Sequence, residues 1–222
     1  GLSGNSVDVD EDLGYLLELD SYFDEDFKFK SGIYDLPVNV KDPDLFDYDE
    51  AEREAKFSAI QADFAKFEEV LYNNGPLGQY LDLDAAARFL FVNELVLNKE
   101  LCHPKSTYLW KGDIYSPESK ITFGPLWDFD WAFGYEETKD YFIYGADTDL
   151  FSAVAHNGKA GYRFYDAIRT SPQGKKAYYK EWINFMAEGR LQELLEYIDD
   201  YTEFAMPSIQ HNNDANISEK NY

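Results

Sequence analysis

Two aspartates in an aromatic-rich segment are the residues of this chain whose types and spacing best suit chemistry. Asp128 and Asp130 lie two positions apart within residues 124–134, which read GPLWDFDWAFG. Side chains at i and i+2 of an extended segment point to one side, and hard cations such as Mg²⁺ prefer oxygen ligands. The spacing therefore predicts that the two carboxylates share a metal ion. The alternative interpretation is that they cap a turn by accepting hydrogen bonds from backbone N–H groups.

A second group of polar residues follows a helix that the pattern predicts over residues 85–98. Glu100, His103 and Lys105 lie in the loop after this helix. A hairpin comes next, and its second strand runs into the two aspartates. This order of elements predicts that the loop side chains converge with the aspartates in space.

Other reactive side chains give weaker signals. His103 is interpreted as a hydrogen-bonded loop residue rather than a ligand, because His156 and His211 lack zinc-site spacing to it. Cys102, the only cysteine, is interpreted as a buried thiol, although His103 beside it leaves a reactive role open. Ser106 has no surrounding Gly-x-Ser-x-Gly pattern, so serine hydrolase chemistry has no support.

The first half of the chain is predicted to supply two short strands and two helices. A strand is expected over 14–20 and another over 27–30, with turns at 36–37 and 42–44. A helix begins after Asp49 and ends at 73–76, because apolar residues recur every three or four positions at Phe57, Ile60, Phe64, Phe67 and Leu71. Asp84 is predicted to cap the helix over 85–98.

The second half is predicted to form a hairpin followed by helices. The hairpin strands are expected over 106–110 and 121–123, joined by a turn over 112–120. Helices are expected over 150–156, 161–169 and 175–198, the last broken at Gly189. The polar end, from 204 to 222, is expected to fray.

Composition and charge exclude two classes of function. The formal charge of −23, from 43 acidic and 20 basic residues, leaves no basic stripe for a nucleic-acid backbone. No stretch reaches the ~18 apolar residues that a membrane span needs. With 45% hydrophobic and 18% aromatic residues, the chain has ample surface to bury and is expected to fold.

Three stretches of the chain resemble the CotH kinase-like family, of the spore coat protein H type. They are GYLLELD at 14–20, VNELVLN at 92–98 followed by HPKSTYL at 103–109, and GPLWDFDWAFG at 124–134. The second and third are similar in style to Bacteroidetes surface proteins. The third stretch is the most specific of the three.

The resemblance implies an α+β, protein-kinase-like fold, here mainly the helical C-terminal lobe with a short catalytic hairpin and remnant N-terminal strands. Its parts would be a frayed start over 1–12, strands near the hinge over 14–45, a helical lobe with the site over 49–205, and a polar tail over 206–222. The family's Arg-Gly-x-Gly-Asn segment and the lysine-bearing strands after it are absent from these residues. The chain is therefore interpreted as an N-terminally truncated domain.

The resemblance also implies Mg²⁺ and ATP as cofactors and phosphoryl transfer to Ser or Thr of a protein. Its site residues would be Asp128 and Asp130 for the metal, Glu100 and Lys105 for catalysis, and Glu18, Asn98, His103 and Ser106 for the cofactor. Glu100 stands where the family has its catalytic Asp. Without the missing segment, this chain alone is not expected to bind the nucleotide or to act as a kinase.

A second interpretation assigns the chain to a different class, a catalytically idle surface module. It would bind protein or glycan through aromatic residues such as Tyr108, Trp110 and those at 141–144. Core packing is the alternative for these rings. Family context and acidity together place the protein outside the cytoplasm or at the cell surface.

Overall fold

The computed structural model describes residues 13–102, 104–130, 132–133, 150–151 and 159–219. The chain consists of two compact units, Gly1–Tyr179 and Lys180–Tyr222. The described residues form an α+β fold, as predicted, with an antiparallel sheet in the first unit. His103 lies outside the described residues. Of the helix expected over 150–156, only residues 150–151 are described.

The sheet has five strands in the order β2-β3-β1-β4-β5, so β1 lies at its centre. Their bounds are β1 Tyr15–Leu19, β2 Lys28–Lys30, β3 Pro37–Asp42, β4 Thr107–Lys111 and β5 Thr122–Phe123. The predicted hairpin is confirmed, because β4 and β5 pair antiparallel. Strand β3 occupies a region where turns were expected. Proline is compatible with the first position of a strand, and residues 37–40 are all buried, with Val38 and Val40 on the core face.

The helices of the first unit follow the predicted apolar periodicity. Their bounds are α1 Glu50–Tyr72, α2 Leu83–Leu95 and α3 Ala160–Thr170, with short 3-10 helices η1 Leu45–Asp47, η2 Leu77–Gln79 and η3 Lys99–Cys102. Helix α1 begins directly after Asp49, as predicted, and the Asp49 side chain caps it by accepting from the Glu52 N–H. The prediction of Asp84 as the cap of α2 is wrong. Asp82 is the cap, since its Oδ1 accepts hydrogen bonds from the N–H groups of Asp84 and Ala85 at 3.1 and 3.0 Å.

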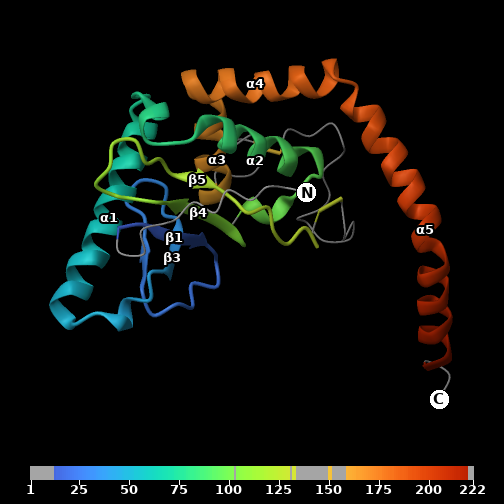
Figure 1. The fold of residues 1–222 in the computed structure, drawn as a ribbon, viewed down its shortest axis with the longest axis horizontal. Coiled ribbons are helices and arrows are strands. Elements are labelled where there is room, and N and C mark those ends of the chain that lie inside the picture. The colour runs from blue at the N-terminus through green and yellow to red at the C-terminus, as the bar shows by residue number, and fades with distance from the viewer. Residues whose placement is uncertain (1–12, 103, 131, 134–149, 152–158, 220–222) are drawn as a thin grey trace. The chain divides into compact units, whose positions relative to one another are not determined.

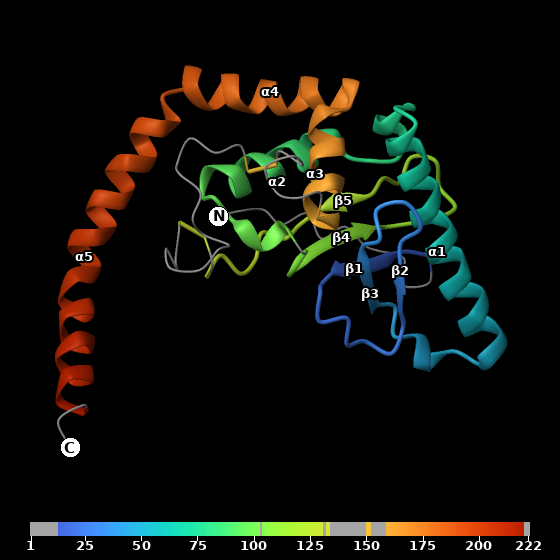
Figure 2. The same ribbon diagram turned by 180° about the vertical axis from the view of Figure 1, so that it is seen from behind.

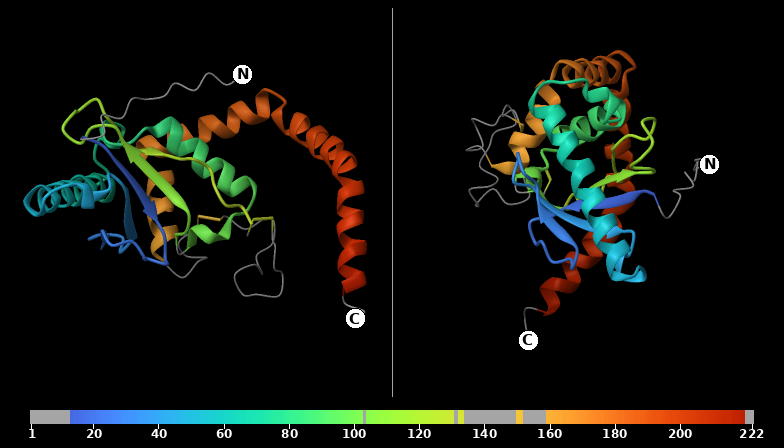
Figure 3. Two further views of the ribbon diagram at one scale, coloured as in Figure 1. Left: turned by 60° about the horizontal axis from the view of Figure 1, so that its bottom comes forward. Right: turned by 90° about the vertical axis from the view of Figure 1, so that its left-hand side faces the viewer.

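One face of the sheet carries the hydrophobic core. Alternate strand residues on this face are buried: Leu17, Leu19, Phe29, Val38, Val40, Leu109 and Phe123 lie on it, and all except the half-buried Phe29 are fully inside. Aromatic rings of the helices pack on these residues, with Phe57 and Phe64 of α1 against Phe29 of β2. Figures 1 and 3 show α1, α2 and α3 beside the sheet, and Figure 2 shows the same arrangement from behind.

A buried polar contact fixes α1 against the centre of the sheet. Tyr15 and Lys111 are direct neighbours across β1 and β4. Both bind Asp63 of α1, the Tyr15 hydroxyl donating to Oδ2 at 2.9 Å and the Lys111 ammonium to Oδ1 at 2.7 Å. Burial and the Asp63 carboxylate raise the pKa of Tyr15 well above its usual value, so the phenol stays protonated.

The second unit contains the end of α4 (Pro172–Ala187) and α5 (Arg190–Glu219). The predicted break at Gly189 is confirmed, and this glycine has a φ of +71°. Helix α5 differs from the prediction because it continues to Glu219 through the region expected to fray, with Pro207 inside it. Helix α5 exposes polar side chains together with large apolar ones such as Tyr197 and Phe204. Gln192 bonds Glu196 one turn later at 2.9 Å.

None of the described helices combines the length and the apolar character required to cross a membrane.

We predict that Asp63→Ala will lower the free energy of unfolding by about 3 kcal/mol, because it leaves a buried lysine without its counter-charge and a buried phenol without its acceptor. Urea unfolding followed by circular dichroism measures this difference. The matched control is Asp47→Ala, which removes an exposed carboxylate and should change the free energy by less than about 0.5 kcal/mol. Equal losses in the two variants would contradict the anchoring role of Asp63.

Candidate functional site

The candidate site begins where β1 ends and β4 starts. Leu19 is paired with Thr107, so the residues just beyond them, Asp20 and Ser106, are brought together. The Ser106 N–H donates to Asp20 Oδ2 at 3.3 Å, and the Tyr22 N–H donates to Asp20 Oδ1 at 2.7 Å. Asp20 is therefore held at two oxygens by backbone donors. It was not among the predicted site residues, although an acid that directly follows a buried strand in GYLLELD was the available signal.

Ser106 also reaches the aspartate predicted to bind metal. Its hydroxyl donates to Asp128 Oδ2 at 3.3 Å. Both residues have left-handed backbones, with φ of +48° for Ser106 and +56° for Asp128, a conformation that costs energy in residues other than glycine. Ser106 thus joins two carboxylates, Asp20 through its N–H and Asp128 through its hydroxyl. The extended geometry assumed for Asp128 in the sequence argument is wrong, because its φ lies in the left-handed region.

The contacts of Ser106 with Asp20 and Asp128 are called the Ser106 junction. Glu100 and Lys105 form an ion pair near it, since the charges of both aspartates act on Glu100. The Lys105 ammonium lies 3.2 Å from Glu100 Oε1 and 4.6 Å from the centroid of the Tyr22 ring. Glu100 is only 2% exposed. Burial raises the pKa of Glu100, the hydrogen bond and charge of Lys105 oppose this, and the charges of Asp128 and Asp20 add to the rise.

The same ion pair raises the pKa of Lys105. Burial acts to lower the pKa of Lys105, but its hydrogen bond to Glu100 and that carboxylate's charge outweigh burial and raise it. Lys105 therefore stays cationic beside Glu100, whose carboxylate is itself influenced by the charges of Asp128 and Asp20. A fixed cation in an acidic site is suited to neutralising part of a phosphate group's charge.

Backbone and amide contacts hold Glu100 in place. The Glu100 N–H donates to Asn98 Oδ1 at 3.3 Å, and Asn98 Nδ2 donates to Asn93 Oδ1 at 2.9 Å. Both ends of the Asn98 amide are therefore engaged in fixing η3. On the other side, α3 approaches so closely that a Cβ at Gly161 would lie 1.9 Å from the carbonyl oxygen of Leu101.

The remaining predicted site residues either form no hydrogen bond or ion pair with Ser106, Asp128, Glu100 or Lys105, or lie outside the described residues. Glu18 lies on β1 and is 3.5 Å from the Lys41 ammonium. Burial and a hydrogen bond to Glu18 raise the pKa of Tyr108 to about 12. Asp130 is exposed, and no hydrogen bond or ion pair links it to another described residue. His103 is not described.

The described side chains could bind a metal ion only if oxygen atoms of a bound ligand or water completed the coordination. Within the described ranges, no group of three or more His, Cys, Asp and Glu side chains is placed to hold a metal ion. Asp128 is exposed, and a serine hydroxyl is the neutral partner of its Oδ2. Mg²⁺ commonly takes one or two protein carboxylates and completes its shell with water and phosphate oxygens. Asp128 fits this mode, with the exposed Asp130 as the second predicted carboxylate.

Comparison with known proteins places the chain in a family. The sequence pattern of the family described as "CotH kinase protein" matches residues 4–220. Neither the curated proteins nor the solved structures contain a significant match.

We predict that Gly161→Ala will destabilise the first unit by about 2 kcal/mol, because the new methyl group overlaps the backbone of η3, which cannot yield like a flexible side chain. Differential scanning calorimetry measures the loss. Gly32→Ala is the control, since no atom lies within 4 Å of a Cβ at that position. A Gly161 variant as stable as the Gly32 variant would show that α3 and η3 separate readily.

We also predict a pH-dependent effect of Glu100→Gln. Because the pKa of Glu100 is raised above its ordinary value of 4.5, the folded protein binds this proton more tightly than the unfolded chain. The wild-type free energy of unfolding should therefore fall, relative to the glutamine variant, as pH rises through the range above about 4.5. Urea unfolding of both proteins from pH 4 to 7 tests this. A difference that stays constant, or grows in favour of the wild type, would contradict it.

Proposed function

The chain belongs to the CotH kinase protein family, and from this premise we propose that it is a kinase-like domain whose full-length protein transfers the terminal phosphoryl group of ATP to Ser or Thr of a protein. The observation that carries the proposal is the junction at Ser106. There the Ser106 hydroxyl donates to Asp128, whose charge acts on Glu100, and Glu100 is paired with Lys105. A carboxylate for a metal and a cation for phosphate are the groups that phosphoryl transfer needs at close range.

Each residue of the junction has a distinct proposed role. Asp128, accompanied by Asp130, would hold Mg²⁺, which supplies neutralisation of phosphate charge when bound. Lys105, kept cationic by Glu100, steadies the charge on the transferred group. Ser106 positions Asp128 through its hydroxyl. We assign Glu18, Asn98 and His103 to the cofactor side, Asn98 acting through its hold on Glu100.

Glu100 is the proposed acceptor-side residue. The acceptor hydroxyl forms a bond to phosphorus as the bond to the leaving phosphate oxygen of ATP breaks, and its proton passes to a carboxylate. A raised pKa makes Glu100 a better proton acceptor than an ordinary glutamate at neutral pH. Because Glu100 is buried beside Lys105, it also orients that lysine.

We propose that residues 1–222 alone do not bind the nucleotide productively. The Arg-Gly-x-Gly-Asn segment through which the family is expected to hold the triphosphate does not occur in them. Acidity and family context further suggest a Bacteroidetes-type protein that acts outside the cytoplasm or at the cell surface.

A catalytically idle surface module is the second candidate. It is favoured by Trp127 and Phe133, which are 62% and 76% exposed and lie on either side of Asp128 in the sequence. Such rings suit contacts with peptide or sugar. The aromatics first considered for this role fit less well, since Tyr108 and Trp110 are half-buried on β4 and residues 141–144 are not described.

Calorimetric titration of ATP in the presence of Mg²⁺ tests the kinase proposal. It should be carried out on residues 1–222 and on an N-terminally extended form, each with Asp128→Ala. We expect binding by the extended form and its loss, by tenfold or more, in the Asp128 variant, because a metal-bridged phosphate contact disappears.

Asp199→Ala is the matched control, since it removes an exposed carboxylate of α5, and it should leave ATP affinity unchanged. If the extended form does not bind Mg²⁺ and ATP, the phosphoryl-transfer proposal is wrong. The surface module then remains.

A further inference from the structure

Two adjoining cavities lie at the opposite end of β1 from the candidate site. The first, of about 450 Å³, is lined by residues just before β1, by Pro43 and by α1. The second, of about 610 Å³, is lined by α1, by η2 and by the turn after β4. Ile114 and Tyr115 line both cavities, so the two adjoin at these residues, and together they are called the groove.

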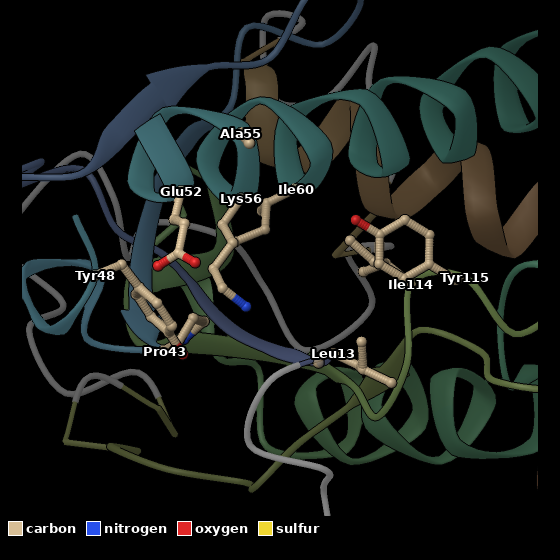
Figure 4. Close-up of a pocket in the computed structure, with 10 residues that line it drawn as sticks. Leu13, Pro43, Tyr48, Glu52, Ala55, Lys56, Ile60, Ile114 and Tyr115 are labelled. Carbon is tan, nitrogen blue, oxygen red and sulfur yellow. The ribbon is translucent and has the colours of Figure 1, made fainter. Parts of the chain in front are cut away.

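One face of α1 forms the floor of this groove. Glu52, Lys56, Ile60, Asp63 and Lys66 recur every three or four residues and line it in sequence. Figure 4 shows Glu52, Lys56 and Ile60 reaching from α1 towards the hollow, with Tyr48 and Pro43 on one side and Leu13 and Ile114 on the other. From residue 52 to residue 66 a helix rises about 21 Å, which matches about six residues of extended chain.

The far end of the groove carries positive charge in a strongly acidic protein. Lys66, Lys111 and Lys120 line the second cavity. Lys111 is neutralised by Asp63, whose other oxygen accepts the Tyr15 hydroxyl. Within the described part of the chain, neither Lys66 nor Lys120 forms an ion pair, and the Lys66 ammonium lies 5.5 Å from the centroid of the Tyr80 ring. Two exposed ammonium groups therefore face this cavity without a carboxylate partner.

The other groups at this end also favour an acidic ligand. Ser116 and Ser119 line the cavity with hydroxyl groups that can donate. Two acidic residues line this cavity, Asp63 and Glu118. Asp63 binds Tyr15 and Lys111, whereas Glu118 is exposed. In a chain with a formal charge of −23, two lysines at one cavity without a carboxylate partner offer an acidic ligand a local attraction.

The near end of the groove offers an apolar side chain one wall to contact. Leu13, Ile60 and Ile114 line the first cavity together with the charged Glu52 and Lys56 of α1. Tyr115, which is 71% exposed, lines both cavities. An extended peptide places successive side chains along a groove at fixed spacing. A ligand with acidic residues at one end and apolar residues at the other matches this order.

We propose that the groove along α1 binds an extended segment of a partner protein, with acidic side chains at Lys66 and Lys120 and an apolar side chain at Ile60 and Ile114. The groove is separate from the Ser106 junction, which lies at the other end of β1. The inference does not depend on phosphoryl transfer, because the contacts need neither nucleotide nor metal. If the protein is a kinase, this surface would select its protein substrates.

Fluorescence anisotropy with labelled six-residue peptides tests the proposal. The probe has three aspartates followed by Gly, Leu and Phe, and is used in this order and reversed. Its counterpart carries asparagine in place of aspartate. Titrations use residues 1–222 without nucleotide or Mg²⁺. We expect one order to bind and its neutral counterpart to bind at least tenfold more weakly, with affinity falling as salt rises.

Variants on the groove locate the binding. Lys66→Gln and Lys120→Gln should each weaken binding about two- to fivefold, as expected for exposed charge pairs, and their combination should weaken it further. Tyr115→Ala should also weaken it with no change in melting temperature, because this ring is exposed. Lys176→Gln, an exposed lysine of α4, and Asp128→Ala should bind as the wild type does.

Three outcomes would overturn the proposal. The first is no binding of either acidic peptide at millimolar concentration. The second is equal binding by the Lys66 and Lys120 variants, which would place the contact elsewhere. The third is displacement of the peptide by inorganic phosphate at low millimolar concentration, which would indicate a small-anion site. A negative ATP titration with a positive peptide result would refute the kinase function and keep the groove.

Discussion

Strands β1 and β4 pair from Tyr15 opposite Lys111 to Leu19 opposite Thr107, and both ends of this pairing carry polar structure. At one end the pair Tyr15 and Lys111 converges on Asp63 and thereby positions α1. At the other end the chain continues into Asp20 and Ser106, whose contact starts the carboxylate junction. A one-residue slip would turn each side chain to the opposite face, so one strand register fixes the groove, the core and the candidate site together.

Glu100 and Lys105 depend on a different constraint, the burial of η3 under α3. An acid among apolar neighbours is costly unless a cation and hydrogen bonds compensate it. Lys105 supplies the cation, and Asn98 fixes the backbone through its amide. Gly161 permits the close approach, because any side chain there would displace the carbonyl of Leu101. The ion pair is thus held by packing on one side and by amide contacts on the other.

The sequence was most informative where a pattern is local. The apolar period of α1, the hairpin of β4 and β5 and the stop at Gly189 follow from neighbouring residues, and the structure contains them. Strand β3 was hidden by Pro37, whose turn signal is overridden by pairing on both sides. Asp20 was missed because its partner Ser106 lies 86 residues away. The left-handed backbone of Asp128 was equally inaccessible, because aspartate adopts this conformation only at particular positions and its neighbours in the sequence do not indicate it.

The central position of β1 has a consequence for how the protein is made. As the chain leaves the ribosome, β1, β2 and β3 are available early, and they pair in the order β2-β3-β1. The outer edge of β1 then presents unpaired N–H and C=O groups until residues 107–111 have been synthesised. Throughout that interval α1 and α2 are translated while the strand they must cover is still open on one side. A nascent chain of this kind is exposed to intermolecular strand pairing, and its yield will depend on how quickly β4 arrives.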